Sequence, residues 1–152
     1  MVGREIMQKG FTMIEMLVTL IIVGILAGLA APAFTSFIAG QNIRAASSML
    51  QSSLLFARSE ALKRNADVIV SPVGGQWASG WTVAVSATAE ALSNNNKVSH
   101  AVVAGPASIT YNNAGRISSG GATFKFSSTQ SGDIRCLNIG LSGMPTITTS
   151  GC

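Results

Sequence analysis

Glu15 is the residue whose chemistry stands out, because its carboxylate lies at the start of a long apolar run. From Met16 to Phe34 the chain carries no charge. As a helix this run would be about 28 Å long, close to the ~30 Å hydrocarbon core of a bilayer. An ionisable side chain at the edge of such a segment is costly unless a cation neutralises it. The sequence therefore predicts a membrane-spanning helix and a cationic partner for Glu15 from outside the chain.

The remaining ionisable residues form no pattern typical of an enzyme. The single histidine is His100, which we expect on the surface or in a strand. No Cys/His cluster has metal-ligand spacing, and no glycine-rich phosphate loop follows a strand and opens a helix. The acidic residues of the carboxyl-terminal part have no spacing that suggests an acid/base pair: Glu60, Asp67, Glu90 and Asp133. We therefore expect no enzymatic activity, no metal and no cofactor.

The two cysteines, Cys136 and Cys152, are separated by 15 residues and are not a C-x-x-C redox pair. A basic leader on the cytoplasmic side of the anchor would place both of them beyond the membrane, where thiols tend to oxidise. Closing a loop of this size contributes ~3 kcal/mol in the chain-entropy model. We predict a disulfide, and the alternative is two unpaired thiols.

The charge balance is modestly basic. Eight basic and four acidic residues follow Gly40, an excess of four positive charges. This excess suits a soluble basic domain as well as it suits a nucleic acid or an anionic surface. If a phosphate-contacting patch exists, the candidates are Lys97, Arg116, Lys125 and Arg135.

A second helical pattern begins after Gly40. Its apolar residues recur every three or four positions, which lines one face of an amphipathic helix that runs on from the anchor to about Lys63. Glycine and proline weaken the helix locally at Gly24, Gly28, Pro32 and Gly40. The apolar positions are Ile43, Ala46, Leu50, Leu54, Ala57 and Ala61.

Beyond Asn65 the pattern changes to short segments that are rich in β-branched residues or alternate apolar with polar side chains. Such segments are typical of half-buried strands. Turn-forming clusters separate them, among them Asn94-Asn95-Asn96. The predicted fold class is α+β, a long amino-terminal helix packed on an antiparallel sheet or on two sheets. The segments are residues 67–71, 81–85, 98–103, 108–111, 124–126, 134–139 and 145–149.

The junction Gly10-Phe11, preceded by Arg4 and Lys9 and followed by Glu15, resembles the processing site of type IV pilins and type II secretion pseudopilins. The resemblance implies that a prepilin peptidase cuts after Gly10 and methylates the new amino-terminal Phe11. It also implies that Glu15 meets the amino terminus of a neighbouring subunit as a filament is built.

Two other interpretations of this amino terminus are a secretory signal and a plain membrane anchor. In a secretory signal, Ala31-Pro32-Ala33 would imitate the cleavage site, but the apolar run is too long, and Glu15 and the proline argue against it. A plain single-span anchor would explain the length and would leave Glu15 and the Gly10-Phe11 junction without a role.

A second set of motifs narrows the resemblance to the group that includes pseudopilin H of type II secretion (GspH) and the minor pilins FimT and FimU. The motifs are Leu55-Phe56-Ala57-Arg58-Ser59-Glu60-Ala61, Lys63-Arg64-Asn65, Gly80-Trp81 and Gly115-Arg116. Within them, Arg58 and Glu60 have either a specific role or only a place on a solvated helix face. We expect Lys63 and Arg64 on that solvated face and Trp81 in the core.

The resemblance implies a pilin-like organisation: residues 1–10 are a cleaved leader, 11–37 a transmembrane helix, 38–65 its amphipathic half and 66–152 a β-rich periplasmic domain. It implies a structural minor pilin or pseudopilin of a type IV pilus or type II secretion pseudopilus. The protein would be single-pass in the bacterial inner membrane. Its partners would be prepilin peptidase and other pilins or pseudopilins.

A second functional hypothesis is that the domain binds DNA during natural transformation. FimT-like proteins of some competent bacteria use a basic Gly-Arg-x-Arg segment near the carboxyl end. In this chain the matching segment reads Gly143-Met144-Pro145-Thr146, so both arginines are missing. Any DNA contact would then have to be made by Lys97, Arg116, Lys125 and Arg135.

Overall fold

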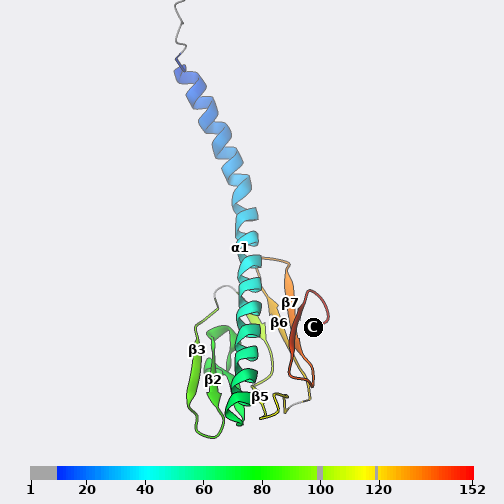
Figure 1. Cartoon of the computed structure of the whole chain (residues 1–152). Coiled ribbons are helices and arrows are strands. Elements are labelled where there is room, and N and C mark those ends of the chain that lie inside the picture. Colours follow the sequence, from blue (N-terminus) through cyan, green and yellow to red (C-terminus); the bar gives the residue numbers. More distant parts are fainter. Residues whose placement is uncertain (1–9, 99–100, 119) are drawn as a thin grey trace, which may run out of the picture. The chain divides into compact units, whose positions relative to one another are not determined.

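The computed structural model describes residues 10–98, 101–118 and 120–152. The chain divides into two units, Met1–Thr35 and Ser36–Cys152. One helix, α1 (Met13–Arg64), runs through both units (Figure 1). Arg4, Lys9 and His100 fall outside the described residues, so the predictions made for them stay predictions.

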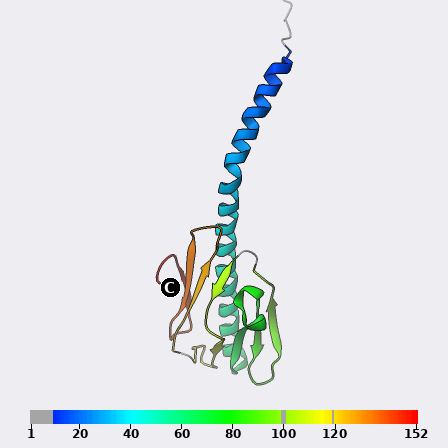
Figure 2. The same cartoon turned by 180° about the vertical axis from the view of Figure 1, so that it is seen from behind.

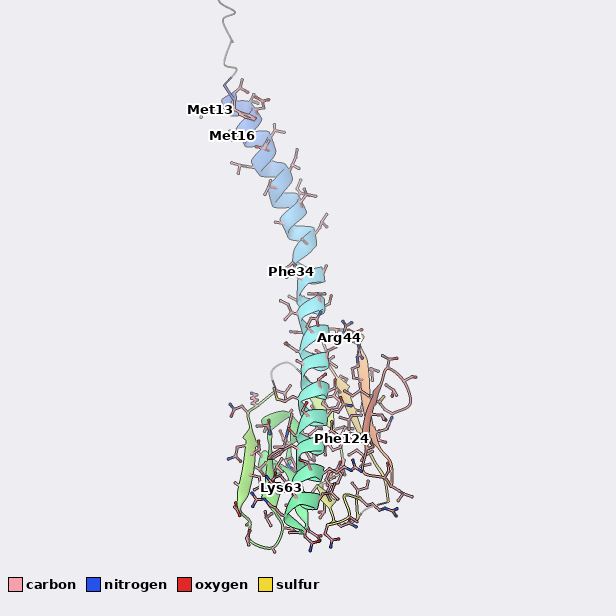
Figure 3. All side chains as sticks on the ribbon, viewed as in Figure 1. Met13, Met16, Phe34, Arg44, Lys63 and Phe124 are labelled. Carbon is pink, nitrogen blue, oxygen red and sulfur yellow. A yellow bond between two sulfur atoms is a disulfide. The ribbon has the colours of Figure 1, made fainter. Side chains whose placement is uncertain are left out.

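The first unit contains the apolar part of α1. This helix is long and apolar enough to cross a membrane, by length and composition. The large apolar side chains of this part, among them Met13, Met16 and Phe34, point away from the helix and are exposed (Figure 3). Helical structure is continuous through Gly24 and Gly28. An exposed apolar surface of this extent requires a membrane or other apolar helices around it.

In the second unit α1 is amphipathic, as predicted. All six apolar positions of the predicted stripe, from Ile43 to Ala61, are buried. The helix ends at Arg64, and Asn65 follows with a φ of 50°. Asparagine tolerates this left-handed conformation better than most residues, and it commonly follows the last helical residue. The predicted end of the helix is therefore confirmed.

Gly40, which was expected only to weaken the helix, has a packing role within this unit. A Cβ atom at this position would meet the carboxylate of Asp133, in the loop that precedes β7 (Ile134–Ile139). The glycine allows that loop to approach the helix backbone closely, and α1 stays continuous there.

Eight strands form two antiparallel sheets, and Figures 1 and 2 show them on either side of the second part of α1. The first sheet has the order β3-β2-β1-β5 and the second β4-β6-β7-β8. Two short 3₁₀ helices, η1 (Val73–Gly75) and η2 (Trp77–Ser79), connect β1 to β2. The other bounds are β1 Val68–Pro72, β2 Trp81–Val85, β3 Ala91–Asn95, β4 Val102–Ala104, β5 Ile109–Tyr111, β6 Ala122–Ser127 and β8 Pro145–Thr148.

One core joins the helix to both sheets. Alternate residues of β2 and β6 face inward, so that Trp81, Phe124 and Phe126 are fully buried together with Leu50 and Leu54 of α1. The prediction that Trp81 lies in the core is confirmed. Burial of large aromatic side chains against the helix supplies the main stabilisation of this unit.

One predicted turn is wrong. Asn94-Asn95-Asn96 was expected to separate strands, but Asn94 and Asn95 lie in β3 and pair with Thr82 and Trp81 of β2. Because β3 is an edge strand with no fully buried side chain, it lacks the apolar alternation that reveals the other strands.

Candidate functional site

The carboxylate of Glu15 folds back onto the start of α1. The backbone N–H of Thr12 donates a 3.2 Å hydrogen bond to Glu15 Oε2, and the Thr12 hydroxyl donates one of 3.3 Å to the same oxygen. In return, the backbone N–H of Glu15 donates to Thr12 Oγ1 at 3.3 Å. This reciprocal pattern is a capping box, and the negative charge also favours the positive end of the helix dipole. The sequence signal for this cap is the Thr-x-x-Glu spacing of Thr12 and Glu15.

Gly10 and Phe11 precede the helix and are exposed. The Phe11 side chain is 77% exposed, and a Cβ atom added to Gly10 would meet nothing within 4 Å. Among the described residues, Glu15 Oε1 accepts no hydrogen bond. The geometry therefore presents an uncovered peptide segment and a carboxylate with one free oxygen, which can accept from a cation.

Cys136 and Cys152 form the predicted disulfide. It joins β7 to the residues that follow β8, with the two Cα atoms 5.3 Å apart. Cys136 is buried on the face of the second sheet that also carries Lys125, its register partner on β6. The bridge therefore fixes the carboxyl-terminal segment over this outer face.

The four candidate DNA-contacting residues do not share one surface. Lys125 pairs in register with Cys136, whereas Arg135 pairs with Phe126, so their side chains leave opposite faces of the second sheet. Lys97 follows β3 of the first sheet, and Arg116 lies between β5 and β6. In the part of the chain that the structure describes, none of the four forms an ion pair.

Arg58 lies where α1 meets both sheets. Its Nε donates a 3.0 Å hydrogen bond to the carbonyl oxygen of Gly115, and its Nη1 lies 3.8 Å from Met144 Sδ. The Tyr111 hydroxyl donates a 3.0 Å hydrogen bond to the carbonyl oxygen of Gly143. Burial raises the pKa of Tyr111 to about 12, so the hydroxyl stays protonated and can donate. Arg58 is thus half-buried and specifically bonded, and its interpretation as a solvated residue is wrong.

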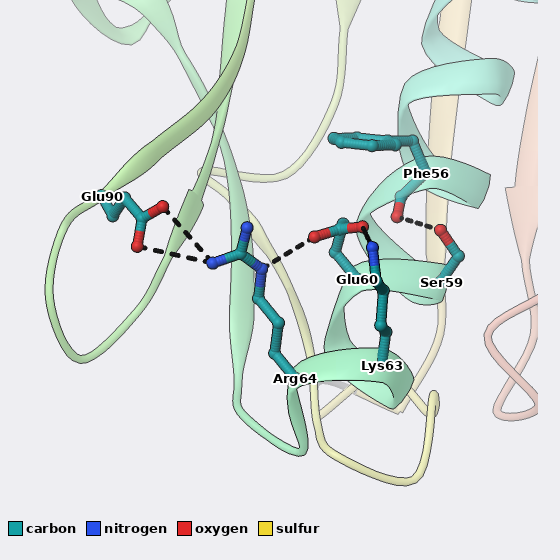
Figure 4. A network of polar contacts seen from close by, with 6 residues as sticks. All are labelled: Phe56, Ser59, Glu60, Lys63, Arg64 and Glu90. Atoms are coloured by element: carbon teal, nitrogen blue, oxygen red, sulfur yellow. Dashed lines mark hydrogen bonds and ion pairs between the residues drawn. The ribbon is translucent and has the colours of Figure 1, made fainter.

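Glu60 is also more than a solvated side chain. It is 8% exposed and accepts a 2.7 Å hydrogen bond from Arg64 Nε, while Lys63 Nζ lies 3.7 Å away (Figure 4). Arg64 Nη1 also reaches Glu90 at 3.3 Å, which ties the helix end to the residue before β3. The Arg64 hydrogen bond, with help from Lys63, holds the pKa of the Glu60 carboxyl below its usual range.

These contacts refine two of the predictions made for the helix end. Lys63 is 78% exposed at its side chain, as expected for a solvated face. Arg64 is also exposed, but it holds Glu60 and Glu90 together, and hydrogen bonding to Glu60 raises its pKa. Among the described residues, no three His, Cys, Asp or Glu side chains gather as metal ligands.

Comparisons with known proteins agree with this arrangement. The family model described as type II transport protein GspH matches residues 46–143, and the prokaryotic N-terminal methylation motif matches residues 7–31. No curated protein matches the chain.

Two solved structures are similar to the chain, both of the type IV minor pilin FimU of Pseudomonas aeruginosa in different crystal forms. The first has a TM-score of 0.61 at 19% identity and covers 73% of this chain and 90% of its own. The second has a TM-score of 0.60 at 21% identity and covers 69% of this chain and 91% of its own. The predicted α+β fold, a long helix packed on an antiparallel sheet or on two sheets, is confirmed, and the structure has two sheets.

Proposed function

Because the chain belongs to the GspH family of type II transport proteins and carries the amino-terminal methylation motif, we propose that it is a structural subunit of a type IV pilus or a type II secretion pseudopilus. The observation that carries the proposal is the exposed apolar part of α1 in the first unit, whose single charge, Glu15, lies at the capped start of the helix. Such a helix suits two successive surroundings, first the membrane and then a bundle of similar helices.

Processing is the first step of the proposal. A prepilin peptidase cuts after Gly10, removes residues 1–10 and methylates Phe11. The segment suits a protease because Gly10 and Phe11 precede the first helical turn and are exposed, so that a backbone in extended form can enter an active site. A glycine at the cut site also leaves the backbone free of a side chain.

The second step is residence in the bacterial inner membrane. Residues 11–37 span the bilayer once, and the domain that follows residue 37 lies in the periplasm. The support is the length and apolarity of α1 and the disulfide between Cys136 and Cys152, which is favoured in an oxidising compartment.

The third step is assembly. In the membrane the capping box holds the Glu15 carboxylate at the helix start through Oε2, and Oε1 accepts no hydrogen bond from the residues that the structure describes. In the filament the amino-terminal amine of a neighbour's Phe11 approaches this oxygen, so that an uncompensated charge in an apolar bundle becomes an ion pair. Only a register that brings amine and carboxylate together avoids the cost of two isolated charges.

Co-expression with a prepilin peptidase and filament components tests the proposal. Intact-mass measurement should show loss of the ten leader residues and an added methyl group on Phe11. The processed chain should then co-purify with sheared filaments or with an isolated tip complex. Cleavage after Ala33 would contradict it, since that is the outcome of a secretory signal. Among the described residues, nothing favours the DNA-binding alternative.

A further inference from the structure

β4 (Val102–Ala104) is an edge strand of the second sheet with one open side. It pairs with β6 along its other side. Among the described residues, no hydrogen bond joins β4 to anything except β6. Its outward backbone N–H and C=O groups therefore form an unpaired row, which is the feature that recruits a further strand.

This open side borders a hollow of about 430 Å3. One wall is the segment 75–78 of η1 and η2, and the other is the segment 101–105 that contains β4. None of these residues is charged. Trp77 fixes the wall, because its Nε1 donates a 2.7 Å hydrogen bond to the carbonyl oxygen of Pro106 and its ring packs edge-on against Phe124 with the centroids 4.8 Å apart.

The other outer strands have features that discourage pairing. The outer side of β5 is already in use, because Tyr111 forms a bridge with Ile117 and the Ser118 N–H donates to the Thr110 carbonyl oxygen. β8 begins with Pro145, and the disulfide holds the chain that follows it. β3 is polar and lies between Glu90 and Lys97. β4 has no charge and no proline, and its Val102 side chain is 55% exposed. Natural proteins protect such edges with short strands, charges, prolines or bulges. β4 has only its short length, three residues, as protection, so its edge can still accept another strand.

We propose that β4 accepts an extended, uncharged peptide segment of another protein as a fifth strand of the second sheet. Backbone hydrogen bonds along β4 supply the affinity, and small or apolar side chains at alternate positions enter the hollow. A charged side chain is excluded there because it would lose water without gaining a partner. This contact is separate from the helix-mediated assembly proposed above, since it uses only the second unit.

Amide hydrogen exchange of the full-length chain in a phospholipid nanodisc tests the proposal. The probe is a blocked peptide, acetyl-Gly-Thr-Val-Thr-Val-Thr-Gly-amide. Its control has the same side chains with every amide between residues N-methylated, so that neither edge can donate. Saturating probe should slow exchange of the outward β4 amides by about tenfold or more, and the N-methylated peptide should not. Equal effects of the two peptides, or no effect of either, would overturn the proposal.

Charged substitutions locate the binding to β4. Val102→Lys and, independently, Ala104→Lys should abolish the protection by the probe, because both positions are exposed on β4. Ile134→Lys is the matched control: its side chain is 41% exposed on β7, away from the hollow, and protection should persist. If neither β4 variant changes the protection while both keep the wild-type circular dichroism, the peptide binds elsewhere and the proposal is wrong.

Discussion

Arg58 Nε, on α1, donates a 3.0 Å hydrogen bond to the carbonyl oxygen of Gly115, which lies 57 residues further along the chain. Through this bond the helix holds the turn that follows β5. On the other side of that turn, a Cβ atom at Gly143 would meet the same Gly115 carbonyl. The helix, the first sheet and the segment before β8 therefore converge on one backbone oxygen.

Arg58→Ala should lower the free energy of unfolding by about 1–2 kcal/mol, because it leaves the Gly115 carbonyl without its donor. Arg116→Ala, which removes a nearby exposed side chain, should change it by less than about 0.5 kcal/mol. Chemical denaturation of the full chain in detergent measures both. Equal effects of the two variants would show that the Gly115 hydrogen bond contributes nothing specific.

Gly143→Ala should be more destabilising than Gly120→Ala, although both glycines have a φ of 75°. The backbone strain of alanine in this left-handed conformation is common to both, roughly 1 kcal/mol. Only at Gly143 does the new Cβ also meet the Gly115 carbonyl and the Tyr111 ring, whereas Gly120 faces open space. Thermal unfolding of the two variants gives the comparison, and similar melting temperatures would contradict it.

Glu15→Gln should insert into the membrane normally and fail to assemble. Glutamine can keep the capping box with Thr12, but it has no charge for the amine of a neighbouring subunit. Glu15→Ala should show the same assembly defect and lose the cap as well. Membrane fractionation and recovery with sheared filaments are the measurements. A glutamine variant that assembles at wild-type levels would assign Glu15 a capping role alone.

The contribution of Glu60 to stability should depend on pH. Its pKa is lowered in the folded protein, so its stabilising effect is fully present above the unfolded-state pKa of about 4.3 and disappears as the pH falls through the folded-state pKa. The melting temperature of wild type should exceed that of Glu60→Gln at pH values about one unit or more above that unfolded-state pKa. The difference should vanish in strong acid, below the folded-state pKa. Glu90→Gln, at the exposed end of the network, should show a smaller difference.

Cys136→Ser and Cys152→Ser should each lower the free energy of unfolding by about 3 kcal/mol in the chain-entropy model, and the double variant should match them, because one bridge is lost in every case. Denaturation with and without reductant measures this. Native protein isolated from the periplasmic side should expose no thiol to alkylation; full labelling of both cysteines would refute the bridge in the cell.

The sequence alone determined the elements that rest on local periodicity. The stripe from Ile43 to Ala61 repeats at helical spacing, and the strand predicted at residues 134–139 matches β7. Because the chain has two cysteines, only one intramolecular disulfide is possible. The capping box between Thr12 and Glu15 also has a local motif, the Thr-x-x-Glu spacing. Each of these signals lies within one element or follows from a count, so no knowledge of the fold was needed.

Tertiary structure alone decided which distant groups meet. Arg58 and Glu60 stand two positions apart in one motif, yet one bonds the turn after β5 and the other bonds Arg64 of its own helix. Likewise, the register between β6 and β7 places Lys125 and Arg135 on opposite faces of the second sheet, although both were candidates for one basic patch. These contacts depend on how the sheets pair and on how the long loops close. Neither produces a periodic pattern in the sequence, because three-dimensional packing, not spacing along the chain, brings the partners together.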